Sequence, residues 1–177
     1  MKIAITGAQS TGKSTLLDAL KKEYKDVQFI EEITRDLKAQ GYKINEEGND
    51  DTQVQIMNLH KKYCNSDENV IYDRCALDGI VYTHYLYNQG NISEDVFQKS
   101  LDIFHEIINS YDKICYLKPE FDIVDDGERS INETFRDEIV DLFNWYIYFY
   151  SIPVIMLTGS VEARVQQFKE VFNDTRN

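Results

Sequence analysis

The amino-acid sequence predicts an α/β domain of three layers, in which a five-stranded parallel sheet lies between two layers of helices. Two observations favour this fold class. Short apolar segments alternate along the chain with longer segments of helical periodicity, and 177 residues can bury a core without disulfides or a structural metal. No repeat, low-complexity tract or linker interrupts residues 1–177, so we expect one domain.

The strands are expected where short runs of apolar, β-branched and aromatic residues occur between polar segments. These runs are too short for helices that would carry their own core-facing stripe. The five expected strands are Lys2–Thr6, Val27–Ile30, Asn69–Tyr72, Lys113–Leu117 and Val154–Leu157.

The helices are expected where apolar residues recur at helical spacing, as Leu16, Leu17 and Leu20 do in the first of them. Asp51 or Thr52 is the expected cap of the second. Residues 118–131 are polar and lack periodicity, which predicts a loop. The six expected helices are Lys13 to about Tyr24, Asp51–Cys64, Leu77–Tyr87, Ser93–Asn109, Asn132–Tyr150 and Val161–Phe172.

The composition is that of an acidic globular protein, with 31 acidic and 19 basic side chains and a formal net charge of −12. On average this charge repels duplex DNA and anionic membranes, although a local basic cleft would remain compatible with it. No long apolar run predicts a membrane span, and the first residues are too short for the apolar part of a signal peptide. Cys64, Cys75 and Cys115 lack the spacing of a zinc site. We therefore expect a cytoplasmic protein.

Residues 7–14 match the phosphate-binding loop pattern GxxxxGK[ST] at every fixed position. The motif follows an expected strand and opens an expected helix, so backbone N–H groups and the helix dipole can face a phosphate. Lys13 would then reach the β- and γ-phosphates of ATP, and the Ser14 hydroxyl would bind Mg²⁺. The residues expected to bind the nucleotide are Gly7, Ala8, Gln9, Ser10, Thr11, Gly12, Lys13, Ser14 and Thr15.

Charged residues follow the second and third expected strands, at the sheet edge where ligands of α/β proteins bind. A carboxylate there can hold Mg²⁺ or take the proton of an acceptor hydroxyl, and an arginine can bind the acceptor or the transferring phosphate. Two simpler interpretations stay open, a solvated helix start for the first group and a structural ion pair between Asp73 and Arg74. The residues concerned are Glu31, Glu32, Arg35 and Asp36 after the second strand and Asp73, Arg74 and Asp78 after the third.

Residues 118–136 are interpreted as a lid that closes over ATP, with Arg129 and Arg136 reaching the phosphates. The acidic residues Asp125, Asp126 and Glu128 in the same stretch are equally typical of a solvated loop.

The histidines His60, His84 and His105 fall on separate expected helices, and we expect them to be packed or surface residues rather than catalysts. The aromatic stretch Trp145–Tyr150 is expected to face the core or an interface, which is compatible with a homodimer.

Four segments resemble the small P-loop kinases labelled "AAA domain" or ATPase, which include the ribosylnicotinamide kinase domain of bacterial NAD regulators and many phage proteins. Together they touch nearly the whole chain in the family's order, and residues 157–165 resemble its usual ending. The chain is unlike an AAA+ motor, because its sequence shows no Walker B acidic pair, sensor arginine or separate helical lid domain. The four segments are GAQSTGKST at 7–15, EEITRDL at 31–37, YDRCALD at 72–78 and DDGERSINETFRDEI at 125–139.

The resemblance implies a P-loop NTPase fold like that of nucleoside and nucleotide kinases. It implies that Glu32 and Arg35 belong to the acceptor site and that Asp73 is the Mg²⁺-associated or base carboxylate. It also implies that the segment around Gly159 and Arg164 lies beside the adenine and that the two lid arginines bind ATP.

The leading functional hypothesis is an ATP- and Mg²⁺-dependent phosphotransferase. It moves the γ-phosphoryl group to a hydroxyl or phosphate of a nucleoside, a nucleotide or a ribosylated base. Lys13, Glu32, Asp73, Arg74 and Arg129 are the expected catalytic residues, and Ser14 and Asp73 the expected metal ligands. The expected substrate-binding residues are Glu32, Arg35, Asp73, Arg74 and Asp78.

Two alternative functions remain. The first is a kinase of a hydroxymethylated base within phage DNA, which would require Lys21, Lys22, Lys38 and Lys43 to line a groove. The second is an ATPase or nucleotide switch that acts on a partner protein.

Overall fold

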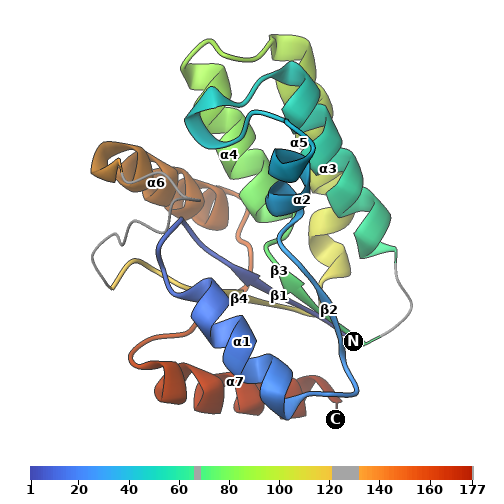
Figure 1. The fold of residues 1–177 in the computed structure, drawn as a ribbon, viewed down its shortest axis with the longest axis vertical. Coiled ribbons are helices and arrows are strands. Elements are labelled where there is room, and N and C mark those ends of the chain that lie inside the picture. The colour runs from blue at the N-terminus through green and yellow to red at the C-terminus, as the bar shows by residue number, and fades with distance from the viewer. Residues whose placement is uncertain (66–68, 121–131, 177) are drawn as a thin grey trace.

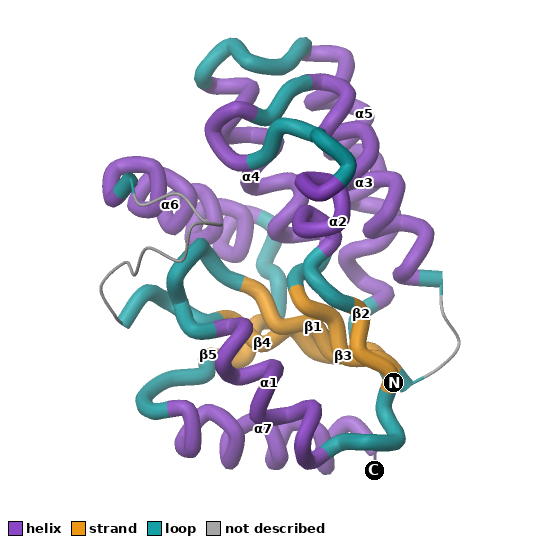
Figure 2. Tube along the Cα trace, viewed as in Figure 1, coloured by secondary structure: helices purple, strands orange, loops and turns teal. Residues whose placement is uncertain are grey.

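The computed structural model describes residues 1–65, 69–120 and 132–176. Five parallel strands form one sheet in the order β2-β3-β1-β4-β5. Helices cover both faces of this sheet, which confirms the predicted three-layer α/β fold (Figures 1 and 2). The strands are β1 (Lys2–Thr6), β2 (Gln28–Ile30), β3 (Val70–Asp73), β4 (Lys113–Tyr116) and β5 (Val154–Met156).

The helices are divided unequally between the two faces of the sheet. In Figure 1, α1 and α7 lie together on one face, and the remaining helices lie on the other face and beyond the carboxyl ends of the strands. The helices are α1 (Lys13–Glu23), α2 (Ile33–Ala39), α3 (Asp50–Cys64), α4 (Ala76–Asn88), α5 (Glu94–Ile107), α6 (Glu133–Phe149) and α7 (Val161–Arg176). Two short 3-10 helices span Asn45–Glu47 and Ile108–Ser110.

Successive residues of each strand pack into different cores, because side chains alternate between the faces of a sheet. Ile3 and Ile5 of β1 pack with the leucines of α1 and the phenylalanines of α7. Ala4 packs on the other side, with Tyr72 of β3 and residues of α3 to α6. Both faces are therefore buried, as is typical of a parallel sheet with helices on each side.

The structure corrects two details of the sequence prediction. Helix α2 was not expected as a separate helix, although Glu32 and Asp36 suggested a helix start. Helix α3 is capped by Asn49 rather than by Asp51 or Thr52, because the Asn49 side chain accepts a hydrogen bond of 3.0 Å from the backbone N–H of Thr52. The other strands and helices agree with the prediction apart from their end residues.

Two further observations bear on the expectations from composition. Within the described ranges, no helix is both long and apolar enough to cross a membrane. The thiols of Cys64, Cys75 and Cys115 are free and buried.

Candidate active site

The phosphate-binding loop joins β1 to α1, and its backbone requires two glycines. Gly7 has a φ of +144°, and a Cβ at this position would lie 2.3 Å from the carbonyl oxygen of Leu117. Gly12 is left-handed with a φ of 85° and precedes the first residue of α1. The loop therefore passes against the end of β4 and turns sharply into the helix.

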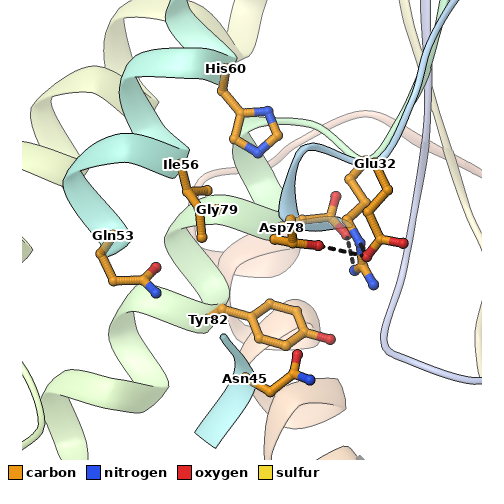
Figure 3. A pocket seen from close by; sticks show the side chains of 10 residues that line it. Glu32, Asn45, Gln53, Ile56, His60, Asp78, Gly79 and Tyr82 are labelled. Carbon is orange, nitrogen blue, oxygen red and sulfur yellow. Dashed lines mark hydrogen bonds and ion pairs between the residues drawn. The ribbon is translucent and has the colours of Figure 1, made fainter. Parts of the chain in front are cut away.

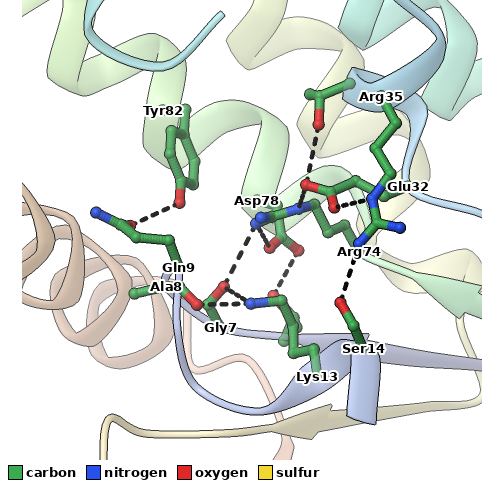
Figure 4. A network of polar contacts seen from close by, with 12 residues as sticks. Gly7, Ala8, Gln9, Lys13, Ser14, Glu32, Arg35, Arg74, Asp78 and Tyr82 are labelled. Carbon is green, nitrogen blue, oxygen red and sulfur yellow. Dashed lines mark hydrogen bonds and ion pairs between the residues drawn. The ribbon is translucent and has the colours of Figure 1, made fainter. Parts of the chain in front are cut away.

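Lys13 lies inside this loop and is buried. Its ammonium group donates hydrogen bonds of 2.7 Å and 2.6 Å to the carbonyl oxygens of Gly7 and Ala8 (Figure 4). Burial, together with the positive charge of Arg74, lowers the pKa of Lys13 to about 7. Because neutral carbonyls compensate a buried ammonium only in part, the loop is suited to an anion that would restore the charge.

Two other polar atoms of the loop are buried and, unlike the Lys13 ammonium group, lack a hydrogen-bond partner among the described residues. Within the part of the chain that the structure describes, the Ser10 hydroxyl and the Gln9 amide nitrogen have no hydrogen-bond partner. Unpaired buried donors are costly unless a ligand satisfies them. This arrangement fits the phosphate groups of a nucleotide, as the sequence predicted.

Four charged residues form a cluster beside the loop (Figure 4). Nε of Arg74 donates to a Glu32 carboxylate oxygen at 2.6 Å, and Nη1 donates to an Asp78 oxygen at 3.1 Å. Nε of Arg35 donates to the second oxygen of Glu32 at 3.2 Å. One buried arginine thus joins two carboxylates, and Glu32 is held between two arginines.

The local backbone explains how these residues meet. Arg74 follows β3 with a left-handed φ of 72°, a conformation that is uncommon outside glycine. Asp78 is in the first turn of α4, where its carboxylate accepts from the backbone N–H of Cys75 at 2.9 Å and from the Thr6 hydroxyl at 2.5 Å. The ends of β1 and β3 and the start of α4 are therefore fixed to one another by the cluster.

The two simpler interpretations, a solvated helix start after β2 and an Asp73–Arg74 ion pair, are only partly correct. Glu31 and Asp36 are exposed, but Glu32 is buried and ion-paired. The ion-pair partners of Arg74 are Glu32 and Asp78 and not the adjacent Asp73. Arg74 is thus a structural ion-pair partner, but of Glu32 and Asp78.

The two candidate base carboxylates differ in their electrostatic environment. Burial acts to raise the pKa of Glu32, but Arg74 and Lys13 outweigh it and hold this pKa well below its usual range. Burial and the charge of Glu32 raise the pKa of Asp73 to about 6. Glu32 is therefore ionised at any ordinary pH, whereas Asp73 becomes protonated as the pH falls through about 6, and a cation bound beside it would lower this pKa.

The residues predicted to hold Mg²⁺ offer the oxygen donors that this ion prefers. The Ser14 hydroxyl at the start of α1 accepts a hydrogen bond of 3.1 Å from Nη2 of Arg35. Asp73 ends β3, and Lys13 lies close enough to Asp73 to favour its charged form. No group of three or more acidic, histidine or cysteine side chains is placed for a metal within the described residues. The donor set therefore fits an ion that keeps water and phosphate ligands.

A pocket opens on the far side of the charged cluster (Figure 3). A second pocket adjoins it, shares Glu32, Thr34, Asn45 and Arg74 with it, and reaches Gln9 of the phosphate loop. Glu32 and Arg74 thus stand between the phosphate loop and the first pocket. The residues that line the first pocket are Glu32, Thr34, Asn45, Gln53, Ile56, His60, Arg74, Asp78, Gly79 and Tyr82.

The sequence prediction identified Asp78 of α4, but not the uncharged residues of α3 and α4 that line the pocket. Gln53, Ile56 and His60 are spaced three and four residues apart along α3, so they share one helix face. This spacing is visible in the sequence, but it equally fits an ordinary core-facing stripe. Only the position of α3 over the ends of the strands makes this face a pocket wall.

Only one of the two predicted lid arginines, Arg136, is among the residues that the structure describes. Arg136 lies in the first turn of α6 and is half-buried. Arg129 lies outside the described residues, so its contact with ATP remains a prediction, as does that of Arg136.

Arg164 connects the C-terminal helix to the phosphate loop. Its side chain is buried, and Nη1 donates to the Thr11 carbonyl oxygen at 2.6 Å. Nη2 donates to Glu120 at 2.8 Å, and the Gly159 backbone N–H donates to the same carboxylate at 2.8 Å. The segment that the resemblance placed beside the adenine is therefore attached to the nucleotide loop.

The sheet order, the phosphate loop and the adjoining charged pocket together define the class as the α/β P-loop kinase fold. The sequence matches the family described as "AAA domain" over residues 2–164, and the chain belongs to this family. None of the curated proteins matches the sequence.

Solved structures with the same fold share little sequence with this chain. Deoxyadenosine kinase from M. mycoides, with products dCMP and a flexible dCDP bound, is 19% identical with a TM-score of 0.74, and the match covers 98% of this chain and 99% of that one. The NadR protein in complex with NR is 21% identical with a TM-score of 0.77, and the match covers 99% of this chain but only 51% of that one. Thymidylate kinase from Candida albicans is 14% identical with a TM-score of 0.62, and the match covers 99% of this chain and 92% of that one.

Proposed function

We propose that this protein is an ATP- and Mg²⁺-dependent kinase that transfers the γ-phosphoryl group of ATP to a hydroxyl of a nucleoside. The observation that carries the proposal is the position of Glu32, whose carboxylate lines the pocket and is paired with Arg74 beside the phosphate loop. An acceptor hydroxyl that hydrogen-bonds to Glu32 would face the end of the nucleotide held by Lys13.

The charge pairing favours a hydroxyl acceptor over a phosphate acceptor. Arg74 is paired with Glu32 and Asp78, and Arg35 is paired with Glu32. A nucleoside monophosphate would meet two carboxylates whose charges already occupy the arginines, and it would be repelled. A neutral hydroxyl can instead donate a hydrogen bond to Glu32.

In the transfer step, the acceptor oxygen forms a bond to the γ-phosphorus, and the bond between the γ-phosphorus and the bridging oxygen of ADP breaks. Glu32 orients the hydroxyl by accepting its hydrogen bond, takes the proton as the new bond forms, and releases it to water because its own pKa is low. Lys13 supplies positive charge to the phosphate oxygens. Bound through Ser14 and Asp73, Mg²⁺ would neutralise part of the charge on the β- and γ-phosphates.

The names of the similar structures support this proposal, since they include a deoxyadenosine kinase and a protein in complex with NR. The acidic net charge of −12 disfavours an acceptor base within DNA. Of the lysines that could have lined a DNA groove, Lys21 is paired with Glu31 at 2.5 Å, which offsets its charge.

The test is transfer from γ-labelled ATP, with Mg²⁺, to a panel of nucleosides, nucleoside monophosphates, ribosylnicotinamide and a hydroxymethyluracil-containing oligonucleotide. We expect the wild-type protein to label a free nucleoside. In Glu32→Gln the rate of transfer should fall by about 100-fold or more, while ATP binding is retained. Glu31→Gln, an exposed neighbour, is the matched control and should keep wild-type transfer. Label on monophosphates alone, on the oligonucleotide alone, or as free phosphate alone would reject the proposal.

A further inference from the structure

His60 is a buried polar side chain that the proposed transfer step does not use. It lies on α3 with 5% of its surface exposed, and its ring points into the pocket between α3 and α4 (Figure 3). Among the residues that the structure describes, none makes a hydrogen bond to this ring. Burial lowers the pKa of His60 to about 4, so the ring is neutral and offers one donor and one acceptor.

Gly79 on α4 is what lets the ring occupy this place. A Cβ at Gly79 would lie 2.5 Å from Sδ of Met57 and 3.1 Å from Cδ2 of His60. Both atoms belong to side chains of α3, so any side chain at residue 79 would displace the Met57 side chain, the imidazole or α3 itself. Glycine at this point lets the two helices lie close together, with the Cδ2–Nε2 edge of the ring beside α4 and His60 lining the pocket.

The pocket is lined by charged residues next to the phosphate loop and by uncharged residues elsewhere. Its charged lining residues, Glu32, Arg74 and Asp78, are joined by ion pairs next to the phosphate loop. The other walls are uncharged, with the apolar side chain of Ile56 close to His60 and the flat ring of Tyr82 at the other end of the pocket (Figure 3). A ligand that puts a hydroxyl at the charged part would therefore place its remaining atoms among uncharged, partly aromatic groups.

We infer that His60 determines acceptor specificity by hydrogen-bonding the edge of an uncharged heteroaromatic base. This inference rests on the proposed function, because it takes the hydroxyl end of the acceptor to lie at Glu32. A flat base packs against Ile56 and Tyr82, and its polar edge satisfies the unpaired imidazole. A permanently charged ring, such as the pyridinium of ribosylnicotinamide, is disfavoured, because both carboxylates of the lining are already paired with Arg74.

The experiment measures binding and transfer separately for uncharged nucleosides and ribosylnicotinamide. Binding is followed by calorimetry in the presence of a non-hydrolysable ATP analogue, for wild type, His60→Leu, Gly79→Ala and the exposed control His105→Leu. We expect His60→Leu to weaken binding of the preferred uncharged nucleoside by about 10- to 100-fold and to leave ATP affinity within about twofold. Gly79→Ala should also weaken nucleoside binding, and His105→Leu should change neither the nucleoside affinity nor the ATP affinity.

Each outcome decides the inference. Equal nucleoside binding by wild type and a folded His60→Leu variant overturns it, as does tighter binding of ribosylnicotinamide than of every uncharged nucleoside. If His60→Leu does not fold, the smaller polar variant His60→Gln is compared across the panel, and an unchanged order of preference again overturns it. Nucleoside binding that depends on His60 without any label transfer supports the inference while rejecting the kinase function, so the two failures are distinguishable.

Discussion

At the scale of single residues, Arg74 shows how burial and charge combine in this site. Its backbone is left-handed, and its guanidinium bridges Glu32 and Asp78. A buried arginine with two carboxylate partners compensates for the desolvation of all three charges, whereas a lone carboxylate there would be costly. The strained turn is thus stabilised by contacts that also hold Glu32 at the pocket.

Lys13 yields a prediction about proton uptake. In the free protein its pKa is about 7 and that of Asp73 about 6, so at pH 8 the amine is largely neutral and the carboxylate is already ionised. Nucleotide phosphates favour the charged amine and raise its pKa above that of the free state. ATP binding at pH 8 should therefore take up a proton, up to about one per site, and the uptake should vanish below pH 6, where the free protein already carries that charge.

Calorimetry in buffers of different ionisation enthalpy measures this uptake. Asp73→Asn should retain it at pH 8, because the Asp73 carboxyl carries no proton there in wild type. Zero uptake or proton release by wild type at pH 8 would contradict the assigned protonation of Lys13.

At the scale of secondary-structure elements, α3 holds one wall of the pocket. Asn49 caps it through hydrogen bonds of 3.0 Å from the Thr52 N–H and 3.1 Å from the Thr52 hydroxyl. The helix packs against α2, α4 and α5, so the cap adds to a helix that is also held by tertiary contacts. The cap therefore affects stability, while packing determines the position of the pocket residues.

Asn49→Ala should lower the free energy of unfolding by about 1 kcal/mol, since it removes a side-chain cap. Denaturant unfolding with a linear extrapolation measures this loss. Asn58→Ala is the matched control, because Asn58 is exposed within the same helix and alanine is the better helix former there. Equal losses in the two variants would show that the cap contributes nothing specific.

Helix α2 illustrates why one element was missed. It has only seven residues, and its buried side chains are Ile33 and Leu37. A single apolar pair cannot define a helical period, so the sequence showed the charged residues of the E-x-x-R segment but not the helix. The helix forms because this pair packs against Ile56 of α3.

At the scale of the whole molecule, Arg164 links distant parts of the chain. It joins α7 to the Thr11 carbonyl of the phosphate loop and to Glu120 after β4. The loop that holds the nucleotide is therefore fixed from the C-terminal side as well as by β1 and α1. On the proposed function, this link predicts that α7 supports nucleotide binding, in addition to its packing on α1.

Arg164→Met should raise the KM for ATP by about 10-fold, leave the KM for the acceptor nearly unchanged, and lower stability by about 1–3 kcal/mol. The reason is that the Thr11 carbonyl and Glu120 lose a charged donor. Steady-state kinetics and thermal unfolding measure these effects.

Lys169→Met is the control for this prediction. Lys169 is a half-exposed residue of the same helix, and it is paired with Glu23 at 2.6 Å. A surface ion pair of this kind contributes less than about 1 kcal/mol, so ATP binding should be unaffected. An Arg164→Met variant that matches this control in its KM for ATP would exclude a contribution of the Arg164 contacts to ATP binding.

The sequence by itself determined the fold class, the five strands and the phosphate-binding loop. These depend on local patterns, namely alternating apolar runs, helical periodicity and a glycine motif with fixed spacing. It also selected Glu32, Asp73, Arg74 and Asp78, since residues after parallel strands meet at one edge of the sheet.

Only the tertiary structure decided which of these residues pair, and which neutral residues complete the pocket. The two ion-pair partners of Arg74 are 42 residues and 4 residues away in sequence. The left-handed backbone of Arg74 accompanies the pairing of its guanidinium with Glu32 rather than with the adjacent Asp73. His60 and Gly79 become significant only where α3 and α4 touch. The Arg74–Glu32 pair and the contact between His60 and Gly79 arise from the packing of elements that are distant in sequence, so no local spacing encodes them.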